Sequence, residues 1–211
     1  MFTKLEFTED VCCIVAKIAD LAGYPFDPLE DACIPLAIDK RRIEFHAGRR
    51  IARIAMSELG VESSTIPVGT NREPVWPSPV TGSISHNQTY VGIAMAKSSD
   101  YQSIGFDLEN HHSVTDAMRK HVLTPDELDT ILDKALDPTF YFSSKEAVFK
   151  AVFPIHREFF SFTDVHIRAQ GARFTARSCN KRLNFAPTIE RGLGKTRLCE
   201  NYLANLFLIP N

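Results

Sequence analysis

Two carboxylates in the middle of the chain, Asp107 and Glu109, have the residue type and spacing needed to bind a metal ion. They lie in the run 103–109, whose alternation of apolar and other residues predicts a β-strand. At two-residue spacing on a strand, both side chains emerge from one face, about 6.5–7 Å apart at Cα. A divalent cation could draw both together, because Mg²⁺ prefers hard oxygen ligands. The alternative is an ordinary solvent-facing stripe on an edge strand.

A second charged pair, Glu146 and Lys150, lies in the segment FSSKEAVFK at residues 142–150. On the helix predicted there, a spacing of four residues places both side chains on one face. The alternative to a functional role is an exposed ion pair between them, which is the commonest reason for this spacing.

Candidate phosphate-binding groups precede both pairs. His86 follows the small residues Gly82, Ser83 and Ser85, which would let a ligand approach the backbone closely. A basic run further upstream contains Lys40, Arg41, Arg42, Arg49, Arg50 and Arg53. Arginine suits phosphate because its planar fork is always charged. The alternatives are a structural histidine and a solvated basic helix face.

The order of these segments resembles the motif series of the Sfp-type 4′-phosphopantetheinyl transferases. Their residues are most similar to the EntD-like (enterobactin synthetase component D) branch of that family. The series reads RRIEFHAGRRIA, REPVWPSPVTGSISHN, IGFDLE and FSSKEAVFK, spanning residues 41 to 150. The resemblance implies an enzyme that moves 4′-phosphopantetheine from coenzyme A to a serine of an apo carrier protein. The implied by-product is 3′,5′-adenosine bisphosphate, and the implied setting is siderophore or other nonribosomal peptide synthesis.

The resemblance also implies a role for each matched residue. The implied magnesium ligands are Asp107, Glu109 and Glu146. The implied coenzyme A-binding residues are Arg41, Arg49, Arg72, Ser85, His86 and Lys150. Lys150 would contact the reacting phosphate, and the attacking serine hydroxyl needs a base. Glu109 and Glu146 both qualify as that base, so the implied catalytic residues are Glu109, Glu146 and Lys150.

Two other functions use the same residues. A magnesium-dependent phosphoester or pyrophosphate hydrolase would employ the same carboxylates and release its product to water. A non-enzymatic RNA-binding module would use the basic run. Only one aromatic residue, Phe45, stands within that run, fewer than stacking on successive bases would require, and the formal net charge of −2 argues against a general nucleic-acid binder.

The elements expected to position these residues follow from hydrophobic period and capping signals. The predicted helices cover 8–22, 39–59, a segment starting at the capping box Thr124–Glu127, and 139–153, ending before Pro154. The predicted strands cover 81–86 and 90–96 as a hairpin, then 103–109, 160–169, 172–177 and 197–208.

Helices followed by strands, twice over, predict an α+β chain of two pseudo-symmetric halves of similar topology, which the resemblance identifies with the 4′-phosphopantetheinyl transferase fold. The N-terminal half, 1–102, would carry the coenzyme A-binding motifs. The C-terminal half, 103–211, would carry the magnesium-binding carboxylates and the catalytic lysine.

Composition and terminal signals indicate the class of the protein, its location and the partners it lacks. Of the 211 residues, 44% are hydrophobic and 24% charged, which is ordinary globular composition. No run approaches the ~18 apolar residues of a membrane span, and the N-terminus turns acidic too early for a signal peptide. The five cysteines show no metal-binding spacing. We therefore expect a cytoplasmic monomer with no nucleic-acid partner and no transmembrane segment.

Overall fold

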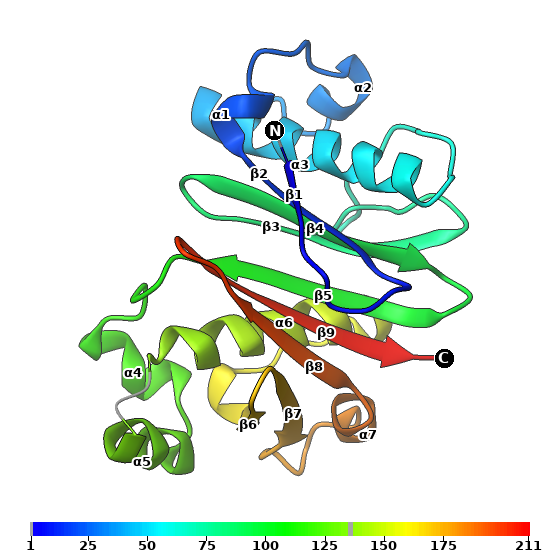
Figure 1. Cartoon of the computed structure of the whole chain (residues 1–211). Helices are drawn as coiled ribbons and strands as arrows, with labels where there is room; N and C mark the ends of the chain where they lie inside the picture. The colour runs from blue at the N-terminus through cyan, green and yellow to red at the C-terminus, as the bar shows by residue number, and fades with distance from the viewer. Residues whose placement is uncertain (1, 135–136) are drawn as a thin grey trace. The chain divides into compact units, whose positions relative to one another are not determined.

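The computed structural model describes residues 2–134 and 137–211, and the chain divides into two units, Met1–Gln102 and Ser103–Asn211. Each unit combines a β-sheet with a long helix that packs against it (Figure 1). The mixed α+β architecture with two sheets confirms the predicted fold class.

The first unit is built on a sheet of order β1-β2-β4-β3, in which all neighbours are antiparallel. The strands are β1 (Phe2–Lys4), β2 (Cys12–Lys17), β3 (Val80–His86) and β4 (Tyr90–Lys97). The helices are α1 (Ile18–Leu21), α2 (Pro28–Asp31) and α3 (Asp39–Glu58). Helix α3 packs against β2, β3 and β4. Its predicted apolar stripe is confirmed, since Ala47, Ile51 and Ala55 are buried in the core.

The β3–β4 hairpin was also predicted correctly, and its turn has a clear local cause. The side-chain oxygen of Asn87 accepts hydrogen bonds from the backbone N–H groups of Thr89 (2.9 Å) and Tyr90 (2.7 Å). This asparagine-centred turn reverses the chain directly after His86. His86 therefore lies at the last position of β3, opposite Val91.

The helix predicted at 8–22 is wrong for most of its length. Residues 12–17 form β2, which lies between β1 and β4, and only Ile18–Leu21 are helical. Because residues 13–16 are all buried, the segment lacks the alternation that marks a half-exposed strand. The predicted order of helices before strands is therefore also wrong in this unit.

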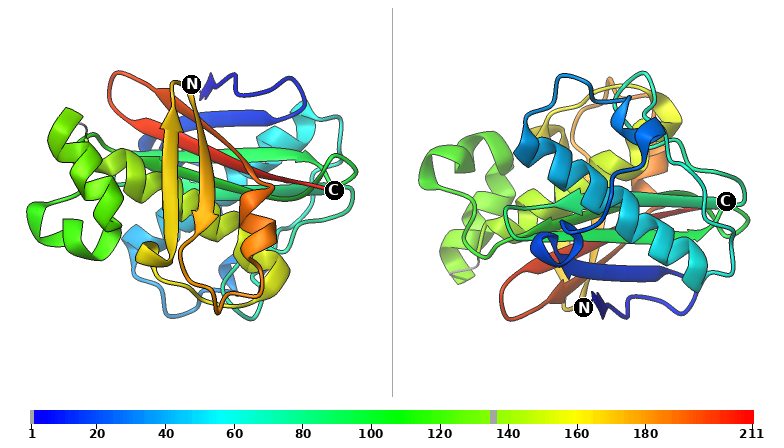
Figure 2. Two further views of the ribbon diagram at one scale, coloured as in Figure 1. Left: turned by 90° about the horizontal axis from the view of Figure 1, so that it is seen from below. Right: turned by 90° about the horizontal axis from the view of Figure 1, so that it is seen from above.

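The second unit is built on a sheet of order β5-β9-β8-β7-β6. The strands are β5 (Tyr101–Glu109), β6 (Val165–Gln170), β7 (Arg173–Ser178), β8 (Leu193–Leu198) and β9 (Leu203–Pro210). The helical segments are α4 (Asp116–Val122), α5 (Pro125–Lys134), α6 (Thr139–His156), the 3₁₀ turn η1 (Phe162–Asp164) and α7 (Ala186–Glu190). Helix α6 packs against β9 and β6, and β6 and β7 run side by side (Figure 2).

Three boundaries in this unit differ from the prediction. Helix α6 continues through Pro154 to His156, because Ala151, Val152 and Phe153 are held in the core and the proline falls in the last turn. The strand predicted at 160–169 starts only after η1. The strand predicted at 197–208 is two strands, β8 and β9, separated by a turn that a hydrogen bond from Cys199 N to Tyr202 O closes.

Candidate active site

The site in the second unit begins with a close approach of α6 to β5. A β-carbon added to Gly105 would lie 1.8 Å from the carbonyl oxygen of Ala147 and 2.6 Å from the backbone nitrogen of Ala151. Only glycine permits this contact, since its missing side chain lets the helix backbone rest directly on the strand. Asp107, two residues along the strand, and Lys150, three residues along the helix from Ala147, are thereby brought together.

Lys150 and Asp107 form an ion pair between these two elements. The Nζ of Lys150 donates a hydrogen bond to Oδ1 of Asp107 at 2.6 Å. Asp107 is 2% exposed, whereas the side chain of Lys150 is 26% exposed. A solvent-facing stripe is therefore the wrong interpretation of Asp107. The alternative for Lys150 was an exposed ion pair with Glu146 on the same helix. It does not describe the structure either, because Lys150 pairs with Asp107 of β5.

Glu109 and Glu146 belong to the same electrostatic cluster. Burial, reinforced by the nearby Asp107, raises the pKa of Glu109 to about 7, with Glu146 adding a smaller push and Lys150 and Ser113 opposing it. Burial likewise raises the pKa of Glu146, where Asp107 adds to the effect and Lys150 opposes it. The structure thus brings together all four residues that the sequence predicted for the magnesium site and the reacting phosphate.

The donor chemistry of this cluster fits a hard divalent cation. Three carboxylates facing one ammonium leave a net negative charge, which Mg²⁺ would neutralise. Within the described residues, however, no three His, Cys, Asp or Glu side chains already stand at the mutual distances of a metal-binding group. Mg²⁺ usually takes only one or two protein carboxylates and completes its octahedron with substrate phosphates and waters. The ligand roles of Asp107, Glu109 and Glu146 stay predictions.

Two of the predicted phosphate-binding residues meet in the first unit. NH1 of Arg41, in the first turn of α3, lies 2.9 Å from Nε2 of His86 at the end of β3. The Glu44 carboxylate lies 3.9 Å from Arg41 and 4.0 Å from His86. Ser85 is buried beside His86 in the strand. The fold therefore places a permanent cation and an imidazole, 45 residues apart in the chain, within reach of one anion.

Arg49 has a different environment. It is 5% exposed, its Nε donates to the carbonyl oxygen of Ile66 at 2.9 Å, and its guanidinium lies 4.4 Å from the centre of the Phe45 ring. Burial lowers its pKa to about 10; Glu30 opposes this shift, and Arg41 adds slightly to it. In this structure Arg49 ties α3 to the loop at Ile66, so its contact with a nucleotide stays a prediction.

Arg72 lies apart from these groups in the chain, in an exposed loop before β3. Its backbone has a φ of 68°, in the left-handed region, and its N–H donates to the carbonyl oxygen of Gly69 at 3.0 Å. A side chain presented from such a turn is exposed to ligands, and the predicted coenzyme A contact of Arg72 stays a prediction.

Half of the basic run on α3 contacts the segment that precedes it. Arg42 pairs with Asp31, and Arg53 pairs with Glu30. Arg50 donates to the backbone carbonyls of Leu21 and Pro25. Sequence reasoning missed these acidic partners, although Glu30 and Asp31 stand together just before the run. A solvated helix face is therefore the wrong interpretation of these three arginines, and Lys40 and Arg41 are the exposed cations.

Comparison with known proteins decides between the functions that this geometry allows. Family profiles described as "4'-phosphopantetheinyl transferase N-terminal domain" and "4'-phosphopantetheinyl transferase superfamily" match residues 29–96 and 103–204. The chain is 34% identical over 156 residues to the 4′-phosphopantetheinyl transferase Npt of Nocardia iowensis, covering 71% of this chain and 70% of that protein. The chain belongs to the 4′-phosphopantetheinyl transferase superfamily.

Other members of the superfamily match at comparable identity. The 4′-phosphopantetheinyl transferase PptT of Mycobacterium tuberculosis is 33% identical over 153 residues, which cover 71% of this chain and 67% of that protein. Enterobactin synthase component D of Escherichia coli is 38% identical over 119 residues, which cover 53% of this chain and 55% of that protein. These matches confirm the resemblance drawn from the motifs, and with it an enzyme that transfers phosphopantetheine from coenzyme A to carrier proteins.

Across residues 2–134 and 137–211, no helix combines the length and the apolar character needed to cross a bilayer.

Proposed function

We propose that this 4′-phosphopantetheinyl transferase works through a magnesium ion held by Asp107, Glu109 and Glu146, with Lys150 acting on the reacting phosphate. The contact of 2.6 Å between Lys150 and Asp107 carries this proposal, because it joins the lysine of one motif to the carboxylates of another. The second unit would thus supply the chemistry, and the first unit would supply the groups that bind coenzyme A.

Cleavage of the coenzyme A pyrophosphate needs alignment and charge neutralisation more than covalent help. When bound, Mg²⁺ would supply positive charge to the pyrophosphate oxygens. Lys150, with its partly exposed ammonium, would add a second positive charge on the transferring phosphate or the leaving group. Glu109 or Glu146 would receive the proton of the attacking serine, directly or through a water molecule.

The nucleotide end of coenzyme A would bind at the first unit. Arg41 and His86 would hold a phosphate together, because their side-chain nitrogens are 2.9 Å apart and Arg41 is exposed. Ser85 would contact coenzyme A from the preceding strand position. Arg49 and Arg72 would support the same nucleotide, the first by fixing α3 and the second from its exposed turn. These residues would also recognise the leaving group, 3′,5′-adenosine bisphosphate.

The acceptor would be the serine of an apo carrier domain, and the similarity to enterobactin synthase component D supports a domain of siderophore or other nonribosomal peptide synthesis. We place the enzyme in the cytoplasm as a monomer, and light scattering of the purified chain tests the oligomeric state. Carrier domains are typically acidic around the modified serine, so the exposed Lys40 and Arg41 would steer them, less strongly at high salt.

Intact mass spectrometry tests this function. Apo acyl, peptidyl and aryl carrier domains are incubated with the protein, coenzyme A and Mg²⁺, and one carrier should gain the mass of a single phosphopantetheine arm. A carrier with its serine replaced by alanine is the control. Hydrolysis of coenzyme A without any gain in carrier mass would instead show the pyrophosphate hydrolase that the sequence left open.

A further inference from the structure

Lys145, the neighbour of Glu146 in α6, has a fully buried ammonium group. Its side chain is 0% exposed, and its Nζ donates to Oε2 of Glu127 at 2.6 Å and to the carbonyl oxygen of Val122 at 2.7 Å. Protein atoms therefore enclose this cation, and nothing in the transfer reaction described above uses it.

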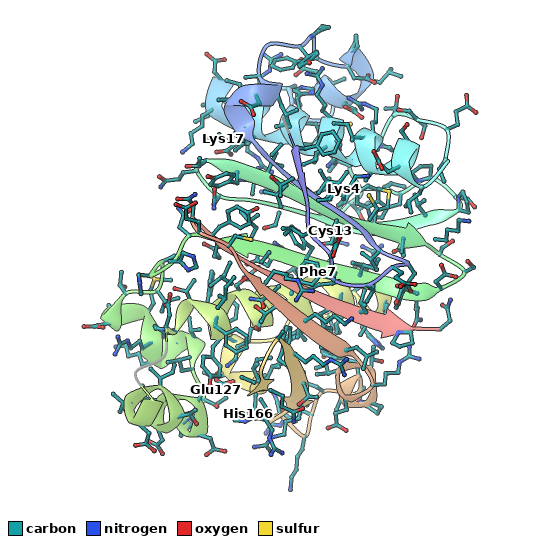
Figure 3. The ribbon with its side chains drawn as sticks, in the orientation of Figure 1. Lys4, Phe7, Cys13, Lys17, Glu127 and His166 are labelled. Atoms are coloured by element: carbon teal, nitrogen blue, oxygen red, sulfur yellow. The ribbon has the colours of Figure 1, made fainter. Side chains whose placement is uncertain are left out.

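Glu127, the partner of Lys145, joins several elements of the second unit. It is also 0% exposed and accepts hydrogen bonds from the backbone N–H groups of Thr124 (2.7 Å) and Ile167 (2.6 Å). The Thr124 hydroxyl lies 3.1 Å from Nδ1 of His166, which stands next to Glu127 (Figure 3). One carboxylate thus links the first turn of α5, strand β6 and, through Lys145, helix α6.

Stability alone is a poor explanation for such a pair. Apolar residues of similar size in place of a buried ion pair are often as stabilising or more so, because both charges lose their hydration. An ion pair with fixed hydrogen bonds differs from apolar contacts in having one defined partner and direction. The hydrogen bonds of Lys145 to Glu127 and to the Val122 carbonyl thus hold α6 at one defined point.

The opposite side of the helix is fixed as well. Positions 145 and 147 are about 200° apart on a helix of 3.6 residues per turn. Ala147 presses on Gly105 of β5, while Lys145 points away into the Glu127 junction. Helix α6 is therefore clamped between a backbone contact and an ion pair. Glu146 lies between the two clamped positions, and Lys150 lies one turn further along the same face.

We propose that Lys145 and Glu127 are positioning residues for the transfer reaction, and that their ion pair sets the rotation of α6 at which Glu146 and Lys150 reach Asp107. This rests on the proposed roles of Glu146 and Lys150. Both side chains are fully buried, so neither would touch substrate. A rotation of α6 by a few degrees would move the Lys150 ammonium away from the phosphate, and transfer depends steeply on such alignment.

The test replaces both charges together, because removing one alone leaves the other buried without its partner. The variant Lys145→Met/Glu127→Gln keeps the shapes of both side chains and retains an acceptor for a backbone N–H. Its control is Asp126→Asn, which changes the adjacent carboxylate of the same turn, an exposed partner of Arg177 at 3.4 Å. Each protein is assayed well below its own unfolding midpoint.

We expect kcat of the double variant to fall about tenfold or more, with KM for coenzyme A within about twofold, while Asp126→Asn keeps wild-type values. Amide hydrogen exchange in residues 145–153, measured without substrate, should be faster in the double variant than in the control. A wild-type kcat in the folded double variant overturns the proposal even if its unfolding midpoint falls. If wild-type protein modifies no carrier, the proposed function fails, and unchanged exchange then overturns the clamp independently.

Discussion

Gly105 and Ala147 are in contact through their backbones, and this contact sets the distance between β5 and α6. A β-carbon on Gly105 would lie 1.8 Å from the Ala147 carbonyl oxygen, a separation that no rotation of a side chain can relieve. Gly105 of the IGFDLE motif and helix α6, which carries the FSSKEAVFK motif, therefore pack directly against each other. The 2.6 Å pair between Asp107 and Lys150 depends on it.

The first prediction concerns this contact. Gly105→Ala must push α6 away from β5, so we expect a loss of about 1–3 kcal/mol of unfolding free energy, the usual cost of overpacking. Transfer should fall together with stability, because Lys150 and Asp107 separate. Urea unfolding measures the first effect and carrier modification the second. Gly23→Ala is the control, since nothing lies within 4 Å of the added carbon. Equal stability of the two variants would contradict the contact.

The second prediction separates the two tasks of Lys150. Lys150→Ala leaves the buried Asp107 carboxylate without this partner, so stability should fall by about 1–3 kcal/mol. Asp107→Asn/Lys150→Ala should recover part of that stability. Both variants should be nearly inactive. In each, kcat should drop on the order of a hundredfold, with a smaller change in KM for coenzyme A. Lys150→Arg should not restore full rate, because a planar fork places its charge differently. Wild-type turnover by Lys150→Ala would remove Lys150 from the site.

The third prediction asks whether Arg49 binds nucleotide or holds the fold. Arg49→Ala removes the hydrogen bond to the Ile66 carbonyl and the contact with the Phe45 ring. A charged hydrogen bond contributes about 1.5–3 kcal/mol, so we expect a loss of that size in unfolding free energy. If Arg49 also reads the 3′-phosphate, calorimetry should show a larger loss of affinity for coenzyme A than for dephospho-coenzyme A. An equal loss for both ligands would show that Arg49 does not read the 3′-phosphate, and no loss for either would assign Arg49 to the fold alone.

Local signals predicted the elements that carry the site. The strand of Asp107 and Glu109, the helix of Glu146 and Lys150, and the hairpin that ends at His86 all appear where period and capping placed them. The capping box of Thr124 and Glu127 is also confirmed, since each residue accepts a hydrogen bond from the backbone of the other.

Contacts between residues far apart in the sequence could not be predicted from these local signals. The apolar run of β2 has no period that separates a buried strand from a helix, because its side chains are buried on both faces of the strand. Arg49 matched a ligand-binding motif, yet its burial depends on the loop at Ile66. The ion-pair partner of Glu127 could not be predicted either, because Lys145 lies 18 residues away on another helix.

The last prediction uses the pKa of Glu109. Burial and Asp107 raise it from 4.5 to about 7 in the folded chain, so between these values the folded protein keeps a proton that the unfolded chain releases. Unfolding then releases a proton, so the contribution of Glu109 to stability falls as pH rises from about 4.5 to about 7. Glu109→Gln abolishes this titration. The unfolding midpoint of the wild type, compared with that of Glu109→Gln, should therefore decline across this range.

Magnesium should reverse that decline if Glu109 is a ligand. A bound cation favours the ionised carboxylate, so it lowers the pKa of Glu109 and stabilises the folded state most strongly above pH 7. Asp107, Glu146 and Lys150 face the same group, and the Glu109→Gln comparison removes their common contribution. Thermal unfolding at several pH values, with and without Mg²⁺, measures both effects without any assay of transfer. If Mg²⁺ raises the unfolding midpoint equally in wild type and in Glu109→Gln at every pH, Glu109 does not belong to the metal site.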